Sequence, residues 1–394
     1  MKSPPSLNPL KPPERTLMGP GPTDVHPDVL RSMAAPMLGH LDSAFLDIMD
    51  EVQELLQYTF QTDNRVTFPV SGTGSAAMET AICNVVRPGD TVLVPSNGYF
   101  GHRMKQMVER AGGEVVTVDA PWGEPLDPAA VEAACERHDP AVFGFVHGET
   151  STGVRQPDVD TLTGIAHEHD ALVIADTVAT MGGVKFLVDE WDVDVTYAGS
   201  QKCLSAPPGA SPITFNRKAL DRIADRTTPV RSWYLDVSLL DDYWGDDRTY
   251  HHTAPISNVY ALREALGRVA EEGIEARWER HTRMSEAIVA GVEGMGLEIH
   301  TDPGHRLPTL NAVQVPDGVD ADAVIGRLLA EYDIEIAGGL GDLAGKIFRI
   351  GCMGYSARSE NVLSVLSAFG HSLSAEGADV DTGAGVAAAS EHLS

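Results

Sequence analysis

A lysine and an aspartate lie at the carboxyl ends of two predicted strands, and together their side chains suit the chemistry of an aldehyde cofactor. Lys202 follows a short apolar stretch, residues 193–198, within the small-residue segment 199–202. Asp176 ends another apolar run, residues 171–175. A lysine amine in such a place can form a Schiff base with the aldehyde of pyridoxal phosphate (PLP), and an aspartate can keep the pyridine nitrogen of that cofactor protonated. The pair therefore predicts a PLP site with Lys202 and Asp176 as its catalytic residues.

Lysine is scarce in this chain, which gives Lys202 added weight. A lysine taken alone is by default a solvated surface charge. The seven lysines are Lys2, Lys11, Lys105, Lys185, Lys202, Lys218 and Lys346. Among them, Lys202 is the one that follows a predicted strand inside a loop of small residues.

A glycine-rich segment, residues 71–79, leads into a predicted helix and can hold a phosphate. Its glycines allow close backbone approach, and its hydroxyls and first helical N–H groups suit a phosphate at the positive helix end. The segment also matches the G-x-G-x-x-A pattern of dinucleotide sites, but the acid expected at the end of the next strand is missing. A nicotinamide dehydrogenase that uses the Gly72 loop is therefore an alternative, one that leaves Lys202 and Asp176 without a role.

Two further loops lie just beyond predicted strand ends, where a doubly wound sheet has its ligand crevice. In residues 97–102, Phe100 can stack on a flat cofactor ring. In residues 147–153, the hydroxyls can reach the ring hydroxyl or the phosphate of a cofactor. His147 and Glu149 have no matching ligand pair nearby in the sequence, so we expect a hydrogen-bonded loop there and no metal site.

Two other segments supply groups that bind anions. Residues 250–255 form a polar loop ahead of a long helical stretch, where a phosphate contact is more plausible than a metal site. Arg349 lies on a predicted strand, residues 347–350. The default role of one arginine is a surface ion pair, but arginine can also hold a carboxylate through two parallel hydrogen bonds. Because the chain also has the predicted Lys202 and Asp176 site, we favour a contact between Arg349 and the carboxylate of a substrate.

The charge of the chain excludes some partners and indicates a saline environment. Fifty-seven acidic residues against 29 basic ones give a formal net charge of −28. Such a charge opposes binding to nucleic acid or to an anionic membrane. Because the acids are spread along the chain and lysine is scarce, we expect a halophilic protein whose self-repulsion is screened by high intracellular salt. An ordinary acidic cytosolic enzyme is the alternative.

Other features of composition are typical of globular proteins. Hydrophobic residues make up 43% of the 394 residues, and this length is sufficient for two domains. No apolar run approaches the roughly 20 residues of a membrane span, and the N-terminus lacks an apolar signal core, so we expect a cytoplasmic location. The four cysteines, Cys83, Cys135, Cys203 and Cys352, have no metal-ligand spacing and do not indicate a disulfide framework.

Strand and helix signals alternate through the first part of the chain. Strands are expected at 91–95, 114–118, 141–146, 171–175, 193–198 and 212–215. Helices are expected at 43–60, 102–111, 128–136 and 159–169. This alternation predicts an α/β fold in which a mixed, mostly parallel sheet lies between layers of helices.

The pattern changes after a long helical stretch that runs, with breaks, from about residue 257 to residue 292. Beyond it, strands are expected at 297–300, 310–315, 334–337 and 347–350, and helices at 321–331 and 359–373. These elements predict a smaller C-terminal α+β domain. We therefore divide the chain into a flexible arm (1–16), a large cofactor-binding domain (17–275), a small C-terminal domain (276–374) and a disordered acidic tail (375–394).

Eight segments that occur in one order together resemble a known family. They are residues 19–22, 71–74, 97–101, 147–153, 175–180, 199–202, 250–253 and 338–341. Over about residues 17–372 the chain resembles the alanine–glyoxylate/serine–pyruvate aminotransferases, which belong to aminotransferase class V and to the PLP-dependent transferases of fold type I. The resemblance implies pyridoxal 5'-phosphate as the cofactor and a homodimer with shared active sites.

The resemblance also implies roles for individual residues. Lys202 would be the Schiff-base lysine and proton carrier, Asp176 the partner of the pyridine nitrogen, and Arg349 the residue that binds the substrate carboxylate. The implied cofactor contacts are Thr73, Gly74, Ser75, Phe100, Thr150, Asp176, Val178, Gln201, Lys202, Tyr250 and Thr253. Tyr250 and Thr253 would reach the phosphate from the partner subunit.

Three positions depart from the family pattern. Phe100 stands where the family often has tryptophan, Thr150 where it often has serine, and Ser75 where some members have histidine. These differences concern fine specificity more than use of the cofactor.

The activity implied by the resemblance is transfer of the amino group of alanine or serine to glyoxylate or pyruvate. A transaminase of the 2-aminoethylphosphonate type, or a PLP lyase, would share the fold. A cysteine desulfurase of this fold needs a mobile cysteine ahead of the carboxylate arginine, whereas Cys352 follows Arg349. A non-catalytic binding protein would have no need of Lys202 and Asp176.

Overall fold

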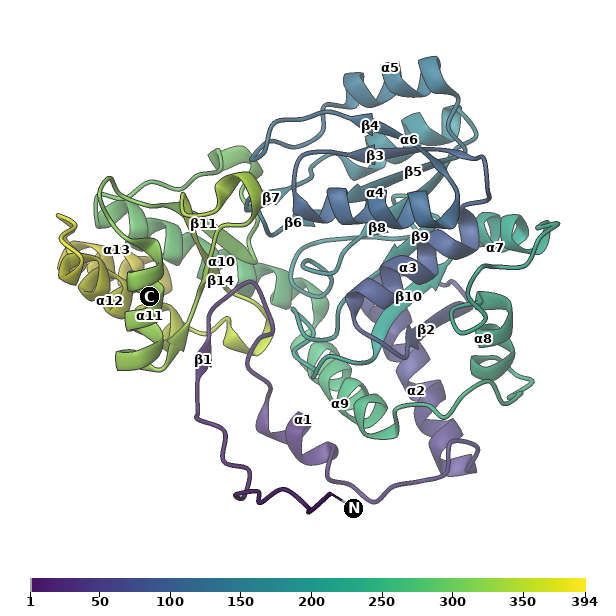
Figure 1. The fold of residues 1–394 in the computed structure, drawn as a ribbon, viewed down its shortest axis with the longest axis horizontal. Helices are drawn as coiled ribbons and strands as arrows, with labels where there is room; N and C mark the ends of the chain where they lie inside the picture. Colours follow the sequence, from purple (N-terminus) through teal and green to yellow (C-terminus); the bar gives the residue numbers. More distant parts are fainter. Residues whose placement is uncertain (1) are drawn as a thin grey trace.

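A seven-stranded mixed sheet forms the centre of the larger of two lobes (Figure 1). The structure is a computed structural model and describes residues 2–394. The strands, in spatial order, are β2 (Val66–Val70), β10 (Ser211–Phe215), β9 (Val195–Tyr197), β8 (Leu172–Asp176), β5 (Val142–Val146), β3 (Thr91–Pro95) and β4 (Glu114–Val118). Strand β10 runs antiparallel to both neighbours, and the pairs from β9 to β4 are parallel.

Helices enclose this sheet. Every residue of β2, β5, β8 and β10 is buried, which requires cover on both faces. The helices of this lobe are α1 (Pro27–Ser32), α2 (Ser43–Phe60), α3 (Gly74–Val85), α4 (Tyr99–Ala111), α5 (Pro128–His138), α6 (Val159–Glu168), α7 (Arg217–Ala224), α8 (Val237–Trp244) and α9 (Ile256–Glu272). The predicted α/β fold with a mixed, mostly parallel sheet is confirmed.

Several helices begin at aspartates, so part of the acidic excess has a local structural role. The side chains of Asp42, Asp127 and Asp236 each accept a hydrogen bond from the backbone N–H two residues later, at the starts of α2, α5 and α8. Such N-caps satisfy one of the free donors of the first turn. Each contributes about 1 kcal/mol to the stability of its helix.

The smaller lobe contains an antiparallel sheet with helices packed against it (Figure 1). The sheet strands, in spatial order, are β11 (Leu310–Gln314), β14 (Ile347–Gly351) and β13 (Ala337–Gly338). The helices are α10 (Ile274–Gly294), α11 (Ala321–Tyr332), α12 (Ser359–Ala375) and α13 (Thr382–Leu393). Short pairs of strands, β1 (Thr16–Leu17) with β12 (Ile334–Glu335) and β6 (Gly148–Glu149) with β7 (Val154–Arg155), complete the strand inventory of residues 2–394.

The N-terminal segment belongs to the core of the smaller lobe, not to that of the larger one. Thr16 and Leu17 pair with Ile334 and Glu335, although we assigned residue 16 to a flexible arm. Met18, assigned to the large domain, is fully buried among residues of the smaller lobe. Its carbonyl accepts a hydrogen bond of 2.7 Å from Gly351 N, so the chain crosses between the lobes at this point.

The C-terminal residues 375–394 do not form the disordered tail that we predicted. Residues Thr382–Leu393 form helix α13, whose first turn is capped by the side chain of Asp381. The helix packs against α10 and α12. We predicted disorder because this segment has few large apolar residues. Helix α13 instead buries small residues, Gly385 and Ala389, in a close helix contact.

This contact gives a stability prediction. A Cβ atom on Gly385 would lie 2.5 Å from the carbonyl oxygen of Gly291 on α10, whereas one on Gly383 would meet only Asp381 Oδ1 at 3.5 Å. We expect Gly385→Ala to destabilise the protein by about 1–3 kcal/mol, through overpacking. Gly383→Ala, the matched control on the same helix, should be neutral or slightly stabilising. Urea unfolding measures both, and equal midpoints for the two variants would contradict the packing described.

None of the helices in residues 2–394 combines the length and apolarity needed to cross a lipid bilayer.

Candidate active site

A cavity of about 200 Å³ opens where β5 and β8 end and α3 begins. Its lining residues are Thr73, Gly74, Ser75, Met78, Phe100, Arg103, Val146, Gly148, Thr150, Asp176, Val178, Ala179, Gln201 and Lys202. The structure thus brings most of the residues predicted from the sequence to one place. Tyr250, Thr253 and Arg349 are not part of this lining.

Lys202 lies in the loop that joins β9 to β10 and is held against the N-terminal segment. Its Nζ atom donates a hydrogen bond to the carbonyl oxygen of Pro20. Gly21 has a φ of 111°, and a Cβ atom there would lie 2.6 Å from Lys202 Cδ, so glycine is required for this approach. Burial lowers the pKa of Lys202 to about 8. An amine with such a pKa is readily available as a base or nucleophile near neutral pH.

Asp176 is the last residue of β8 and is 4% exposed. Its Oδ1 atom accepts a hydrogen bond from Val178 N at 2.9 Å, and its Oδ2 atom accepts one from the hydroxyl of Tyr197 at 3.1 Å. Burial raises the pKa of Asp176 to about 6, although these hydrogen bonds oppose the shift. A cationic group placed in the cavity would compensate the buried charge of the carboxylate.

The start of α3 provides an anion site at one end of the cavity. No side chain caps the N-terminus of this 12-residue helix, which begins at Gly74 after Thr73. A Cβ atom on Gly74 would meet Val178 Cγ2 at 3.1 Å, so the backbone approaches the cavity closely. The Oε1 atom of Gln201 is buried without a hydrogen-bond partner. The uncapped helix start and the close backbone approach fit a bound anionic group, whereas the Gln201 oxygen, an acceptor, fits a donor group of a ligand.

Arg103 lines the cavity and was not singled out from the sequence. Its Nη1 atom donates to Ser75 Oγ at 3.1 Å, and its guanidinium group lies 4.9 Å from the ring centroid of Phe100. A signal for it existed, because Arg103 follows Phe100 by three positions on α4 and shares its helix face.

Glu149 connects the two loops that follow β3 and β5. It is 1% exposed, its Oε2 atom accepts from Phe100 N at 2.9 Å, and its Oε1 atom accepts from Ser151 Oγ at 2.6 Å. Burial raises the pKa of Glu149. No group of three or more His, Cys, Asp or Glu residues within residues 2–394 has a metal-binding arrangement. The hydrogen bonds of Glu149 to Phe100 N and Ser151 Oγ orient Phe100 within this loop.

Arg349 lies on β14 of the smaller lobe, next to the cavity. Its Nη1 atom donates to the carbonyl oxygen of Thr150, a lining residue, at 3.2 Å, and its Nε atom donates to Gly338 O at 2.7 Å. The side chain is 5% exposed, and burial lowers its pKa. Its guanidinium group is therefore positioned by the backbone of both lobes.

Tyr250 and Thr253 are exposed and lie away from the cavity lining of their own chain. Tyr250 is 56% exposed and contacts the ring of His40 at a centroid distance of 5.0 Å. Within one chain these two residues have no access to the cavity. A contact with a cofactor phosphate would require a second subunit.

Cys352 does not have the properties of a catalytic thiol. It is fully buried, and burial raises the pKa of its thiol to about 12. Reactive cysteines instead have a lowered pKa and some exposure. The residue therefore has a packing role in the core of the smaller lobe.

The class of protein follows from comparison with known families. The family model described as aminotransferase class-V matches residues 25–349, which is more than half of the chain. The chain therefore belongs to the class-V aminotransferase family. This assignment favours a transaminase over the nicotinamide dehydrogenase and the non-catalytic binding protein.

Individual relatives are similar along nearly the whole chain. A solved structure of a ureidoglycine–glyoxylate aminotransferase from Bacillus subtilis is 42% identical, with a TM-score of 0.96 over 98% of this chain and 100% of that one. A solved alanine–glyoxylate aminotransferase from Nostoc sp. is 48% identical, with a TM-score of 0.92 over 93% of this chain and 97% of that one. The alanine–glyoxylate aminotransferase of Drosophila melanogaster is 43% identical and matches 93% of this chain and 95% of its own length.

Proposed function

We propose that this protein is a PLP-dependent aminotransferase that passes the amino group of a small donor to glyoxylate or pyruvate. The observation that carries the proposal is the presence of Lys202 and Asp176 in one cavity, beside the uncapped N-terminus of α3. A lysine, a buried carboxylate and an anion site are the three groups that PLP requires of a protein.

The described residues fit this cofactor. Thr73, Gly74 and Ser75 would hold the phosphate at the helix N-terminus, and the unpartnered Oε1 of Gln201 marks a polar position at the same end of the cavity. Phe100 and Val178 would enclose the ring, and Thr150 would contact its hydroxyl. Arg103 would add positive charge close to the phosphate, since it already contacts Ser75.

When bound, PLP supplies an aldehyde that takes up amines and a ring that accepts electrons. Lys202 would hold the cofactor and carry the proton that moves during transfer, because a pKa of about 8 lets its amine act as a base. Asp176 would keep the pyridine nitrogen protonated, with Tyr197 and Val178 N fixing the orientation of its carboxylate. Arg349 would bind the substrate carboxylate from the smaller lobe.

We favour glyoxylate as the acceptor, because it appears in the names of both groups of similar enzymes. Their donors differ, being alanine in one and ureidoglycine in the other. Amine transfer to glyoxylate should be measured with alanine, serine and (S)-ureidoglycine, and transfer to pyruvate with serine and (S)-ureidoglycine. Turnover with at least one of these pairs is expected. Absence of transfer with every pair, in a protein that binds PLP, would contradict the proposed substrates.

The proposal includes a homodimer with shared active sites. A group of exposed aromatic side chains supports it: Trp233 is 63% exposed, Tyr234 is 42% exposed and Tyr250 is 56% exposed. The hydroxyl of Tyr234 contacts Ser71 O at 3.5 Å, which places this surface beside the glycine-rich segment that leads into α3. Trp233 and Tyr234 both contact the ring of His251, so these exposed side chains lie close together, and exposed apolar groups that gather in this way are typical of interaction surfaces. Thr253 would reach the phosphate of the partner's cavity from this surface.

A subunit-mixing experiment tests the role of Thr253. Lys202→Ala and Thr253→Ala subunits, mixed and re-associated, should regain one intact site per heterodimer and hence part of the turnover and PLP retention. Lys202→Ala mixed with Asp176→Asn is the matched control, because both residues line the cavity of the same chain and no intact site can form. Activity equal to the sum of the separate variants in both mixtures would contradict a shared site.

We also propose that the protein works in the cytoplasm of a salt-rich cell. With a formal net charge of −28, subunits repel themselves and each other at low ionic strength. The Debye length falls from about 10 Å at about 0.1 M salt to about 3 Å at about 1 M. We therefore expect the melting temperature, dimer content and PLP retention to rise with KCl concentration. An unchanged melting temperature between low and molar KCl would contradict the proposal that the acidic residues adapt the protein to salt.

A further inference from the structure

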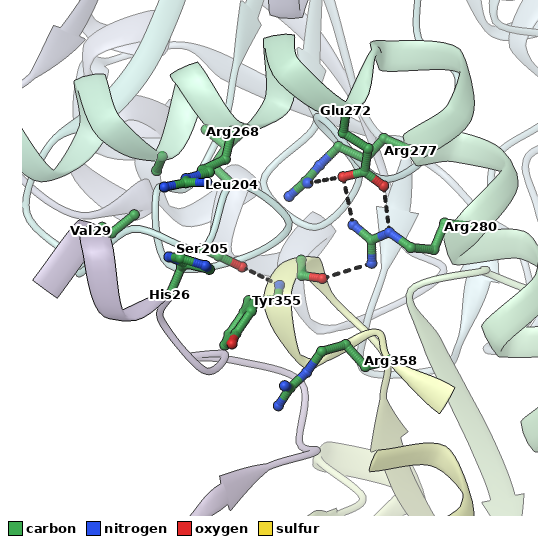
Figure 2. Close-up of a pocket in the computed structure, with 12 residues that line it drawn as sticks. His26, Val29, Leu204, Ser205, Arg268, Glu272, Arg277, Arg280, Tyr355 and Arg358 are labelled. Carbon is green, nitrogen blue, oxygen red and sulfur yellow. Dashed lines mark hydrogen bonds and ion pairs between the residues drawn. The ribbon is translucent and has the colours of Figure 1, made fainter. Parts of the chain in front are cut away.

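A second cavity, of about 270 Å³, lies between the two lobes (Figure 2). Its lining residues are His26, Val29, Leu204, Ser205, Ala265, Arg268, Glu272, Arg277, Arg280, Gly354, Tyr355 and Arg358. They come from α1 and the residue before it, from α9 and α10, and from the turn that precedes α12. Leu204 and Ser205 follow Lys202 in the chain, so this cavity touches the loop that carries the candidate catalytic lysine. The proposed transaminase activity gives this cavity no role.

The charge of this lining is opposite to that of the whole chain. The lining contains four arginines, Arg268, Arg277, Arg280 and Arg358, and one carboxylate, that of Glu272. Figure 2 shows Glu272 in contact with two of them, Arg277 and Arg280. In a protein with about twice as many acidic as basic residues, a cavity of this sign is unusual. It favours a negatively charged occupant.

Glu272 is shared between two of the arginines. Its carboxylate lies 2.6 Å from Arg277 Nη1 and 2.5 Å from Arg280 Nε. Burial alone would raise the pKa of Glu272, but the hydrogen bonds and charges of the two arginines outweigh it and lower the pKa to about 2. Arg280 in turn lowers the pKa of Arg277, after burial as the first cause. The neighbouring cations therefore repel each other, and one carboxylate does not balance both.

Unsatisfied donors are concentrated at the same place. Six arginine Nε groups in residues 2–394 are buried without a hydrogen-bond partner, and three of these belong to Arg268, Arg277 and Arg358. The side chain of Arg277 is 6% exposed. A buried N–H without an acceptor costs about 1–3 kcal/mol, and donors to an anion form stronger hydrogen bonds than neutral pairs. An oxyanion in the cavity would place negative charge beside these buried donors.

The other acids near these arginines lie outside the cavity lining. Arg268 contacts Asp28, Glu264 at 3.4 Å and Glu271 at 3.3 Å, and Arg358 contacts Glu360 at 3.1 Å. These acids compensate part of the charge of Arg268 and Arg358 from outside the lining. Within the lining itself, four guanidinium groups stand against the one carboxylate of Glu272.

The remaining lining is suited to an apolar body of small size. Val29, Leu204 and Ala265 are apolar, and the ring of Tyr355 lies between His26, at a centroid distance of 4.9 Å, and the guanidinium carbon of Arg358, at 4.3 Å. The volume is slightly below the usual range for small-molecule pockets, roughly 300–1,000 Å³. A compact metabolite fits, whereas a nucleic acid or a protein segment does not.

We propose that this cavity is a binding site for a small metabolite that carries a carboxylate or phosphate group on an apolar body. Its arginines hold the oxyanion, and the apolar residues and Tyr355 enclose the remainder. The site is joined to the Lys202 loop at two points: Arg277 Nη2 donates to Cys203 O at 2.5 Å, and Ser205 Oγ accepts from Tyr355 N at 2.7 Å. A bound anion therefore stiffens the backbone segment that follows Lys202.

Thermal melting of the PLP-saturated enzyme tests this site without requiring turnover. Potassium phosphate or potassium acetate replaces KCl stepwise at constant ionic strength, so that general screening stays fixed. Bound PLP keeps phosphate out of the anion site at α3. We expect a saturable rise in melting temperature with at least one of the two anions, and the anion that acts identifies the charged group.

Substitutions distinguish this cavity from other arginine sites. Arg358→Gln and, as a second variant, Arg268→Gln should raise the half-saturating concentration about tenfold. The matched control is Arg327→Gln, because Arg327 also has an unpartnered Nε and contacts Glu331 and Glu376, yet lies outside the cavity. Arg349→Gln should keep the response. No saturable response to either anion, an unchanged response in both cavity variants, or loss of it in Arg349→Gln would overturn the proposal.

Discussion

Replacing Lys202 by alanine should abolish amine transfer and covalent attachment of PLP. The cavity lining contains one amine, and it is that of Lys202. Without it there is neither an attachment point nor a base of suitable pKa near the substrate. We expect turnover to fall by about 10⁴-fold or more, since the variant loses general base and covalent catalysis together.

Steady-state turnover of Lys202→Ala should be compared with that of Lys185→Ala. Lys185 is exposed and lies outside the cavity, so its replacement should leave turnover unchanged. Retention of PLP by Lys202→Ala through non-covalent contacts would be compatible with this account. Turnover within about tenfold of the wild type would contradict the role of Lys202 as the base.

Replacing Asp176 by asparagine should have the second-largest effect. The amide can accept the hydrogen bond from Tyr197, but it cannot stabilise a positive charge on the pyridine nitrogen. We expect a loss of about 10²–10⁴ in turnover with partial retention of PLP, which is the usual range for such electrostatic and acid–base contributions. Turnover and the amount of bound PLP should be measured on the same preparation.

Asp194→Asn separates loss of this charge from loss of any buried aspartate. Asp194 is fully buried in the same lobe and accepts hydrogen bonds from Val173 N at 2.7 Å and Asn216 Nδ2 at 2.7 Å. It is not a lining residue, so its replacement should lower stability and leave turnover per folded molecule nearly unchanged. Equal losses of turnover in the two variants would contradict a specific role for Asp176.

The elements were predictable where apolar residues form a short continuous run, as in a buried strand, or recur at helical spacing. Strands 91–95 and 114–118 and helix 43–60 have the predicted limits. Strand β2 was not predicted, because Pro69 interrupts its pattern. The structure shows why proline is tolerated there: β2 is at the edge of the sheet and pairs with β10 alone.

Other predictions failed because tertiary contacts outweigh local sequence patterns. The strand predicted at 297–300 is reduced to one bridge, between Ile299 and Val313. The stretch from 257 to 292, by contrast, was predicted to run with breaks, and it divides into α9 and α10 at Gly273, whose φ of 84° ends the first helix. Helix α13 was missed because its close contact with α10 uses glycine and alanine, which carry little hydrophobic signal.

The candidate site was predictable at strand ends and less so elsewhere. Asp176 ends a buried strand, and Lys202 and Thr150 follow buried strands, where the sequence indicates a ligand crevice. Tyr197 was missed because a tyrosine inside an apolar strand resembles a core residue, and only the register of β8 with β9 places it beside Asp176. The arginine-lined cavity between the lobes could not be predicted, since its residues come from five separate segments of the chain.

The most direct test of the central claim is borohydride reduction of the PLP-loaded enzyme, followed by peptide mapping. Reduction fixes the cofactor to the lysine that carries it. We predict a pyridoxyl label on the peptide that contains Lys202 and on no other peptide. A label on Lys105 or Lys185, or no label on an enzyme that transfers amines, would contradict the assignment of this cavity as the active site.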